Sequence, residues 1–204
     1  MAATDPFPGI ARSYLVRVDG ATIWEHVAGE RVAPASLTKL MTAVLVDESA
    51  RLDEVVTISA RAAAATGSRL GVKAGERFVV KDLLAAAMIA SANDACRALA
   101  EWRDGFEAAF VHRMNRKAAA LGLGDTRFMN ACGHDAVGHY STARDLARLA
   151  EAAMASAAIA DLVRRPAFTI STADRSRTFL LANRNALIGR FDGAIGVKSG
   201  FTPK

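Results

Sequence analysis

The sequence predicts an α/β domain into which an all-helical lobe is inserted. Segments that alternate like strands lie near both ends of the 204-residue chain, and segments with helical periodicity fill the middle. Hydrophobic residues make up 51% of the chain and charged residues 23%, so the chain can bury a core and lacks the composition of a disordered protein. The length fits a single domain, with the helical lobe at about residues 60–165.

The first element that the sequence predicts is a β-hairpin. Residues 13–18 and 21–27 both read as strands, and Asp19 and Gly20 between them form a strong two-residue turn signal. Three later segments are also expected to be strands: residues 52–59, 168–172 and 191–198. Residues 61–78 contain three glycines and are expected to form a loop.

Five segments are expected to be helices because their apolar residues recur at helical spacing. Pro34 and Ser36 suit the start of the first helix, and Gly122 suits the end of the fourth. Thr142 and Asp145 form a capping box at the start of the fifth. The expected helices are residues 36–49, 80–90, a segment that begins near 94, 106–121 and 142–155.

Charge and cysteine content narrow the function classes only partly. The formal net charge is +5, but the basic residues are scattered and no aromatic residues are interleaved with them, so nucleic-acid binding is not expected. An anionic polymer or an acidic small substrate fits the charge equally well. Cys96 and Cys132 are too few for a disulfide framework or a zinc site, and the sequence leaves open whether they pair. No apolar run has transmembrane length and no signal peptide is visible, so localisation must be inferred from function.

Three short motifs each occur once: Ser36-Leu37-Thr38-Lys39, Ser91-Ala92-Asn93 and Lys198-Ser199-Gly200. Taken singly, each has an ordinary structural reading, namely a helix start, a helix cap and the end of a strand. Their order along the chain is much harder to attribute to chance, since one falls at a helix start, one between two helices and one at a strand end. This ordered set resembles the active-site signature of penicillin-binding proteins and serine β-lactamases.

Longer matches narrow the resemblance to one family. The stretches A-P-A-S-L-T-K-L-M-T, S-A-N-D-A, G-H-Y-S-T-A-R-D-L-A and D-G-A-I-G-V-K-S-G-F-T are similar to those of the D-alanyl-D-alanine carboxypeptidases, the low-molecular-weight penicillin-binding proteins of the peptidase S11 type. The similarity runs from about residue 10 to the end of the chain. It implies the fold of the β-lactamase/transpeptidase-like superfamily, an antiparallel sheet flanked by helices with an inserted helical lobe.

The chemistry of the first motif agrees with this resemblance. Ser36 is expected at a helix N-terminus, where free N–H groups and the helix dipole favour developing negative charge. Lys39 lies one turn further on the same face. A serine hydroxyl needs a nearby base, and a lysine can be that base only if burial or a second cation lowers its pKa. Lys198 would be the second cation if its strand end reaches the site.

The resemblance implies roles for the remaining motif residues. Ser91 would move a proton between Lys39 and the leaving amine, and Asn93 would hold a substrate amide. Lys198 and Ser199, with Gly200 in the same motif, would bind the terminal carboxylate of the substrate. The backbone N–H groups of Ser36 and Phe201 would form the oxyanion hole.

No metal site and no cofactor are expected. His134, Asp135 and His139 lie close in sequence, but no further ligand with suitable spacing accompanies them, so a loop is the expected structure. The chain departs from the family in having K-S-G where K-T-G is usual, and serine keeps the hydroxyl. It also lacks the E-x-x-x-N setting of class A β-lactamases, which disfavours that branch.

The end of the chain is the second departure. In the family, two further strands and a helix follow the K-T-G strand and complete the sheet, whereas this sequence stops four residues after Gly200. The C-terminal strands of the sheet are therefore expected to be missing, and residues 1–204 are expected to be a single catalytic domain that is incomplete at its C-terminus. The family's second domain and membrane-attaching helix are not expected in this chain either.

The resulting functional expectation is a serine D-Ala-D-Ala carboxypeptidase. It would remove the terminal D-alanine from peptidoglycan stem peptides through an acyl-enzyme, and β-lactam antibiotics would be covalent inhibitors. Such a role in the cell wall implies a periplasmic or other extracytoplasmic location. The alternatives are a β-lactamase or DD-endopeptidase of the same fold, or a relative that binds peptidoglycan without turning it over.

Overall fold

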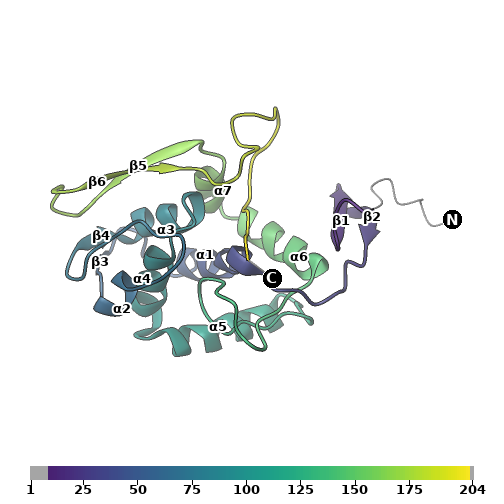
Figure 1. Cartoon of the computed structure of the whole chain (residues 1–204), viewed down its shortest axis with the longest axis horizontal. Coiled ribbons are helices and arrows are strands. Elements are labelled where there is room, and N and C mark those ends of the chain that lie inside the picture. The colour runs from purple at the N-terminus through teal and green to yellow at the C-terminus, as the bar shows by residue number, and fades with distance from the viewer. Residues whose placement is uncertain (1–8, 203–204) are drawn as a thin grey trace.

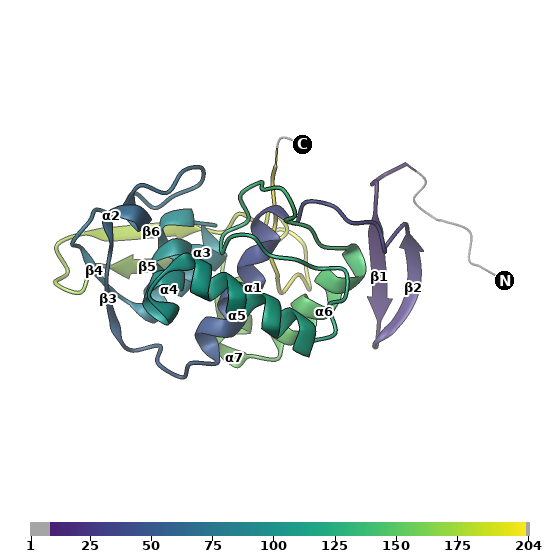
Figure 2. The same cartoon turned by 90° about the horizontal axis from the view of Figure 1, so that it is seen from below.

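The computed structural model describes residues 9–202, which form a helical body with a β-hairpin at each of two opposite ends (Figures 1 and 2). The helices in this part of the chain are α1 (Lys39–Asp47), α2 (Ala60–Ala63), α3 (Val80–Ile89), α4 (Asn93–Asp104), α5 (Glu107–Ala120), α6 (Ala143–Met154) and α7 (Ala157–Val163). The strands are β1 (Tyr14–Val18), β2 (Ala21–His26), β3 (Val55–Thr57), β4 (Arg77–Val79), β5 (Ala167–Ser171) and β6 (Thr178–Ala182). A short 3-10 helix, η1 (Ala35–Thr38), leads directly into α1.

The predicted N-terminal hairpin is confirmed as the antiparallel pair β1–β2, with Tyr14 opposite His26. Its turn residues Asp19 and Gly20 have φ values of 49° and 80°, and two positive φ values in succession suit the twist of a tight hairpin. In both figures this hairpin lies at one end of the molecule, beside α6.

The core of the helical body surrounds α1. Every residue from Lys39 to Val46 is buried, and α1 contacts α3, α4, α5, α6 and α7. A helix that is buried on all sides needs an almost wholly apolar sequence, which α1 has except for Lys39 and two threonines. Helix α3 is also almost fully buried, and its alanines allow α4 to pack closely against it. The predicted helical lobe thus shares one core with α1 and α7.

The strands of the described residues form three separate two-stranded antiparallel sheets: β1–β2, β3–β4 and β5–β6. The first and last of these lie at opposite ends of the molecule (Figure 1). Sheet β5–β6 packs on the helical body through β5 and β6 against α3 and through Phe179 against Phe78. The strand-like segments near the two ends of the chain therefore do not pair with each other within residues 9–202.

Several sequence-based expectations need correction. Residues 191–198 were expected to be a strand but have no regular structure, because Gly193 and Gly196 adopt φ values of 86° and 159° and no described strand lies alongside to pair with the segment. The expected loop 61–78 begins inside α2, which Ser59 caps, and ends in β4. Helix α7 and strand β6 were not predicted. The expected helix 36–49 starts with a 3-10 turn. Across residues 9–202, no helix combines the length and the apolar character that crossing a membrane requires.

Candidate active site

Ser36 and Lys39 are brought together by the 3-10 turn that precedes α1. Ala35 has a φ of 47°, a left-handed conformation that is costly for a residue with a side chain, and it turns the chain sharply into η1. In a 3-10 helix the side chains at positions i and i+3 are eclipsed. Lys39 Nζ consequently lies 3.1 Å from Ser36 Oγ.

A glycine that the sequence analysis did not single out makes this turn possible. Gly133 has a φ of 90°, and a Cβ atom there would lie 1.8 Å from the carbonyl oxygen of Ala35. The loop containing Gly133 therefore packs backbone to backbone against the turn that presents Ser36. Only the position of the Ala35 carbonyl reveals this requirement, so no sequence signal pointed to it.

Lys39 is fully buried, with 0% of its surface exposed. Its Nζ donates hydrogen bonds to Ser36 Oγ (3.1 Å), to Asn93 Oδ1 (2.7 Å) and to the carbonyl oxygen of Cys132 (2.7 Å). Burial, and to a smaller extent the positive charge of Lys198, lower the pKa of Lys39 to about 7. A substantial fraction of this amine is therefore uncharged at neutral pH, and it can accept a proton from Ser36.

The second motif lies in the break between α3 and α4. Ser91 has a φ of 58°, so the chain reverses sharply there and Asn93 becomes the first residue of α4. Asn93 is held on its other side as well, because its Nδ2 donates to the carbonyl oxygen of Thr66 (2.6 Å). Its Oδ1 is thereby aimed at Lys39, and both Ser91 and Asn93 are about 7% exposed.

The third motif reaches the site although it is not in a strand. Lys198 Nζ donates to Ser91 Oγ (2.9 Å), and Ser199 Oγ donates to the carbonyl oxygen of Arg184 (3.3 Å). Thr202 Oγ1 donates to Asp135 Oδ2 (2.6 Å), so side chains attach the segment at both ends. Burial and the positive charge of Arg184 lower the pKa of Lys198 to about 8.

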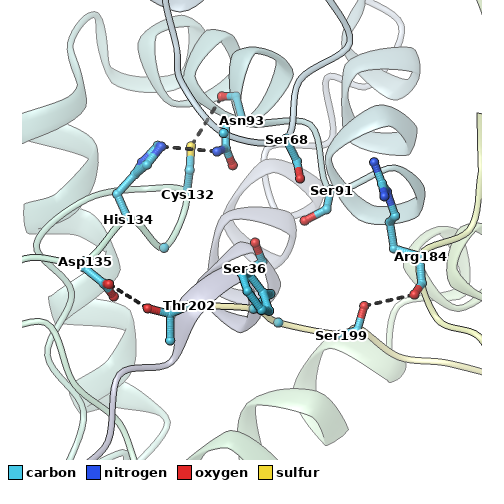
Figure 3. A pocket seen from close by; sticks show the side chains of 14 residues that line it. Ser36, Ser68, Ser91, Asn93, Cys132, His134, Asp135, Arg184, Ser199 and Thr202 are labelled. Carbon is cyan, nitrogen blue, oxygen red and sulfur yellow. Dashed lines mark hydrogen bonds between the residues drawn. The ribbon is translucent and has the colours of Figure 1, made fainter. Parts of the chain in front are cut away.

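A cavity of about 580 Å³ lies between these three segments. Ser36, Ser91, Asn93, Ser199, Gly200 and Phe201 line it, and Lys39 and Lys198 reach its serine hydroxyls with their Nζ atoms. Figure 3 shows Ser91 and Arg184 on one side of Ser36, with His134 and Asp135 on the other. All eight residues chosen from the sequence are thus at or next to this cavity. Five other lining residues were not chosen: Gly67, Ser68, Cys132, Gly133 and Arg184.

The histidines that raised the question of a metal have other surroundings. His139 Nδ1 accepts from the backbone N–H of Met129 (3.0 Å), so Nε2 carries the proton and donates to Thr38 Oγ1 (2.9 Å). His134 lines the catalytic cavity, with its Nε2 atom 3.2 Å from Asn93 Nδ2. Within residues 9–202, no cluster of three or more histidine, cysteine or acidic side chains is arranged to hold a metal ion.

Cys96 and Cys132 form a disulfide, with Cα atoms 5.9 Å apart, which answers the question that the sequence left open. Cys96 lies in α4, one turn after Asn93. Cys132 lies in the loop whose carbonyl oxygen accepts from Lys39. The disulfide therefore joins two of the segments that hold the lysine amine in place.

The geometry provides a serine nucleophile, a buried amine that can act as its base, a second serine held by a second amine, and a cavity beside them. Comparisons with known proteins point in the same direction. The model of a family described as D-alanyl-D-alanine carboxypeptidase matches residues 9–204. The chain is 38% identical over 196 residues to D-alanyl-D-alanine carboxypeptidase DacF of Bacillus subtilis (strain 168), which covers 91% of this chain and 49% of that protein. It thus spans about half the length of this relative.

Solved structures agree with the sequence comparisons. The Streptomyces K15 DD-transpeptidase superposes with a TM-score of 0.88 at 32% identity, covering 99% of this chain and 84% of that one. A D-alanyl-D-alanine carboxypeptidase from Mycobacterium tuberculosis H37Rv superposes with a TM-score of 0.91 at 30% identity, covering 99% of this chain and 77% of that one.

Proposed function

The chain belongs to the D-alanyl-D-alanine carboxypeptidase family, and from that premise we propose that it is a serine carboxypeptidase that removes the terminal D-alanine from peptidoglycan stem peptides. The observation that carries this proposal is the buried Lys39 amine, whose pKa is about 7, at 3.1 Å from the Ser36 hydroxyl. A serine becomes a nucleophile when a base at hydrogen-bonding distance can take its proton.

In the acylation step, neutral Lys39 takes the proton of Ser36 and Ser36 Oγ attacks the carbonyl carbon of the penultimate D-alanine. The backbone N–H groups of Ser36 and Phe201 stabilise the negative charge that develops on the carbonyl oxygen. The peptide bond then breaks, an acyl-enzyme forms, and the terminal D-alanine leaves with a proton on its nitrogen. Water cleaves the ester and returns the proton to Ser36.

Ser91 is the residue that we propose protonates the leaving nitrogen. Lys198 Nζ donates to Ser91 Oγ, so the hydroxyl proton of Ser91 is directed elsewhere and is available to the cavity. The positive charge of Lys198 and the hydroxyl of Ser199 bind the terminal carboxylate next to that nitrogen. Asn93 holds the amide on the acyl side of the scissile bond, as well as positioning Lys39.

The same chemistry makes the protein a target of β-lactam antibiotics, whose strained amide would acylate Ser36 in place of the peptide. Peptidoglycan lies outside the cytoplasmic membrane, so we place the action of the protein in the periplasm or another extracytoplasmic space. Its proposed partners are stem peptides that end in D-Ala-D-Ala, and its proposed role is in cell-wall maintenance.

The test is intact-protein mass spectrometry after incubation with benzylpenicillin, with Ser36→Ala as the control. We expect a mass gain of one penicillin in the wild type and none in the variant, and we expect release of D-alanine from an N-acylated tripeptide ending in D-Ala-D-Ala. Circular dichroism establishes that both proteins are folded. A folded wild-type protein without adduct or D-alanine release would contradict the proposal and favour a peptidoglycan-binding relative without turnover.

A further inference from the structure

A second cavity, of about 520 Å³, adjoins the catalytic one. We call it the β6 groove. Its long wall is formed by consecutive residues from Phe179 to Arg184, and its opposite wall contains Arg69, Leu70 and Ala90. Nothing in the reaction described above uses this groove.

The β6 groove continues directly from the catalytic cavity. Arg184 lines both. Ser68 and Ser91 line the catalytic cavity, and their chain neighbours Arg69 and Ala90 line the groove. Three separate stretches of chain therefore pass from one cavity into the other at the same place.

That junction is on the leaving-group side of the catalytic cavity. In the proposed reaction, Ser91 protonates the leaving nitrogen and Lys198 binds the carboxylate beside it. Asn93, His134 and Asp135 lie on the other side of Ser36 from Arg184 (Figure 3). A group attached to the leaving nitrogen, and larger than free D-alanine, would thus extend past Arg184 into the groove.

The wall of the groove suits an extended peptide. Successive side chains of a strand point to opposite faces, so a wall made of consecutive residues is the edge of β6 and not one of its faces. Strand β5 occupies the opposite edge, and β6 pairs with no other strand in residues 9–202. An open strand edge can accept the backbone of an added peptide.

Both walls are fixed in position. The Arg184 backbone N–H donates to the carbonyl oxygen of Ile89 (3.0 Å), which holds the end of the β6 wall beside Ser91. On the other wall, the buried carboxylate of Asp94 accepts from the backbone N–H groups of Leu70 (3.0 Å) and Gly71 (2.8 Å). Arg69 is thereby placed at a defined point of the groove.

The charge of the groove indicates an anionic occupant. Arg69 and Arg184 are both exposed, and neither forms an ion pair with a carboxylate of the described residues. Leu180, which also lines the groove, is 75% exposed and offers apolar contact. Acidic groups on an extended peptide would pair with the arginines while its backbone lies along β6.

We propose that the β6 groove binds a second, acidic peptide strand carried by the leaving amine, so that the protein also cleaves the amide cross-link between a D-alanyl carbonyl and the amine of a neighbouring peptide. The inference rests on the proposed function, because it uses the same acyl-enzyme. Ser36 Oγ bonds to the D-alanyl carbon, the cross-linking C–N bond breaks, and the amine leaves with a proton from Ser91. Water then cleaves the ester, so the overall reaction consumes one water and yields one acid and one amine.

The test compares two substrates in the full chain. One is an N-acylated tripeptide ending in D-Ala-D-Ala, and the other is a synthetic dimer in which the D-alanyl carbonyl is joined to the side-chain amine of a second, acidic peptide. Arg69→Gln and Arg69→Glu are the variants, because Arg69 lines only the β6 groove among the two cavities. Arg61→Gln is the matched control, since Arg61 is an exposed arginine that lies outside both cavities.

We expect the wild-type protein to cleave the dimer. Arg69→Glu should lower kcat/KM for the dimer by about tenfold, Arg69→Gln by less, and Arg61→Gln not at all. None of the three changes should affect the tripeptide or the penicillin adduct. Cleavage of the tripeptide alone, or equal effects of Arg69→Glu on both substrates, would overturn the inference. If the wild type cleaves neither substrate and forms no penicillin adduct, the proposed function itself fails and this inference with it.

Discussion

At the scale of single residues, the site depends on one buried amine. An ordinary lysine is neutral in about one molecule in a few thousand at pH 7. Lys39 has a pKa of about 7, so burial raises its neutral fraction by roughly a thousandfold. Its three acceptors favour the charged form, but removal from water outweighs them. The amine can therefore exist in both states that a proton transfer requires.

This environment predicts how acylation depends on pH. The second-order rate constant for acylation by a fluorescent penicillin should rise with pH through a midpoint near 7, as Lys39 becomes neutral. It should fall again near pH 8, as Lys198 loses the charge that binds the carboxylate. Lys198→Met removes a positive neighbour from Lys39. The pKa of Lys39 should then rise, so the acid midpoint should move to higher pH and the fall near pH 8 should disappear.

The shift in the Lys198→Met variant should remain well short of an exposed lysine, because burial is the larger cause of the lowered pKa of Lys39 and remains in place. Pre-steady-state measurements from pH 5.5 to 9.5, with thermal melts to establish folding, give the two profiles. An acid midpoint that stays in place or moves to lower pH in Lys198→Met would contradict the assignment of Lys198 as the second cation.

At the scale of elements, the site is held by a loop that packs on the turn before α1. This loop, residues 127–141, is fixed by backbone bridges from Arg127 to Tyr140 and from Val32 to Ser141, and by the disulfide of Cys132. It supplies the carbonyl oxygen of Cys132 to Lys39 and the flat surface of Gly133 to Ala35. Its packing thus determines where both the serine and its base are placed.

Gly133→Ala should therefore abolish detectable penicillin acylation and lower the melting temperature. The added Cβ would lie 1.8 Å from the Ala35 carbonyl oxygen, and this backbone atom cannot move aside without displacing Ser36. Gly138→Ala is the matched control in the same loop. Gly138 also has a positive φ, of 80°, but a Cβ there would come no closer than 3.8 Å to any atom.

Both variants carry the strain of a positive φ, so the difference between them isolates the steric clash. Gly138→Ala should keep its acylation rate within about twofold of the wild type and lose only about 1 kcal/mol of stability. If Gly133→Ala is acylated as fast as Gly138→Ala, the contact between the loop and Ala35 does not position Ser36.

The sequence predicted the elements whose periodicity is strong and missed those that depend on distant partners. The helices from α3 to α6 follow from their apolar spacing and their caps. Strands β4 and β6 exist because β3 and β5 lie beside them, and the segment 191–198 stays irregular because no described strand does. The motif residues could be chosen in advance because their types and order are distinctive. Gly133 and Arg184 could not, because their importance depends on which atoms lie opposite them. The catalytic roles of the motif residues stay predictions.

At the scale of the whole molecule, the site and the N-terminal hairpin belong to parts of different stability. The catalytic residues come from η1, α1, α4 and the segment after β6, all of which contact the buried core. No residue of β1 or β2 is buried. Side-chain ion pairs of Arg17 with Glu151 and of Arg144 with Glu25 join the hairpin to α6. Exposed ion pairs contribute at most about 1 kcal/mol each, so they hold the hairpin much less firmly than core packing holds the helices.

Native-state hydrogen exchange should separate these two parts. Amides of α1, α3 and α4 should exchange most slowly, and their opening free energy should fall with added urea because they open only when the whole domain unfolds. Amides of β1 and β2 should exchange faster, with an opening free energy that hardly depends on low urea, since separating the hairpin from α6 exposes little apolar surface. Mass spectrometry of peptic fragments across a urea series measures both. Equal protection and equal urea dependence would mean that the hairpin unfolds together with the helical core, and the catalytic site would then depend on it.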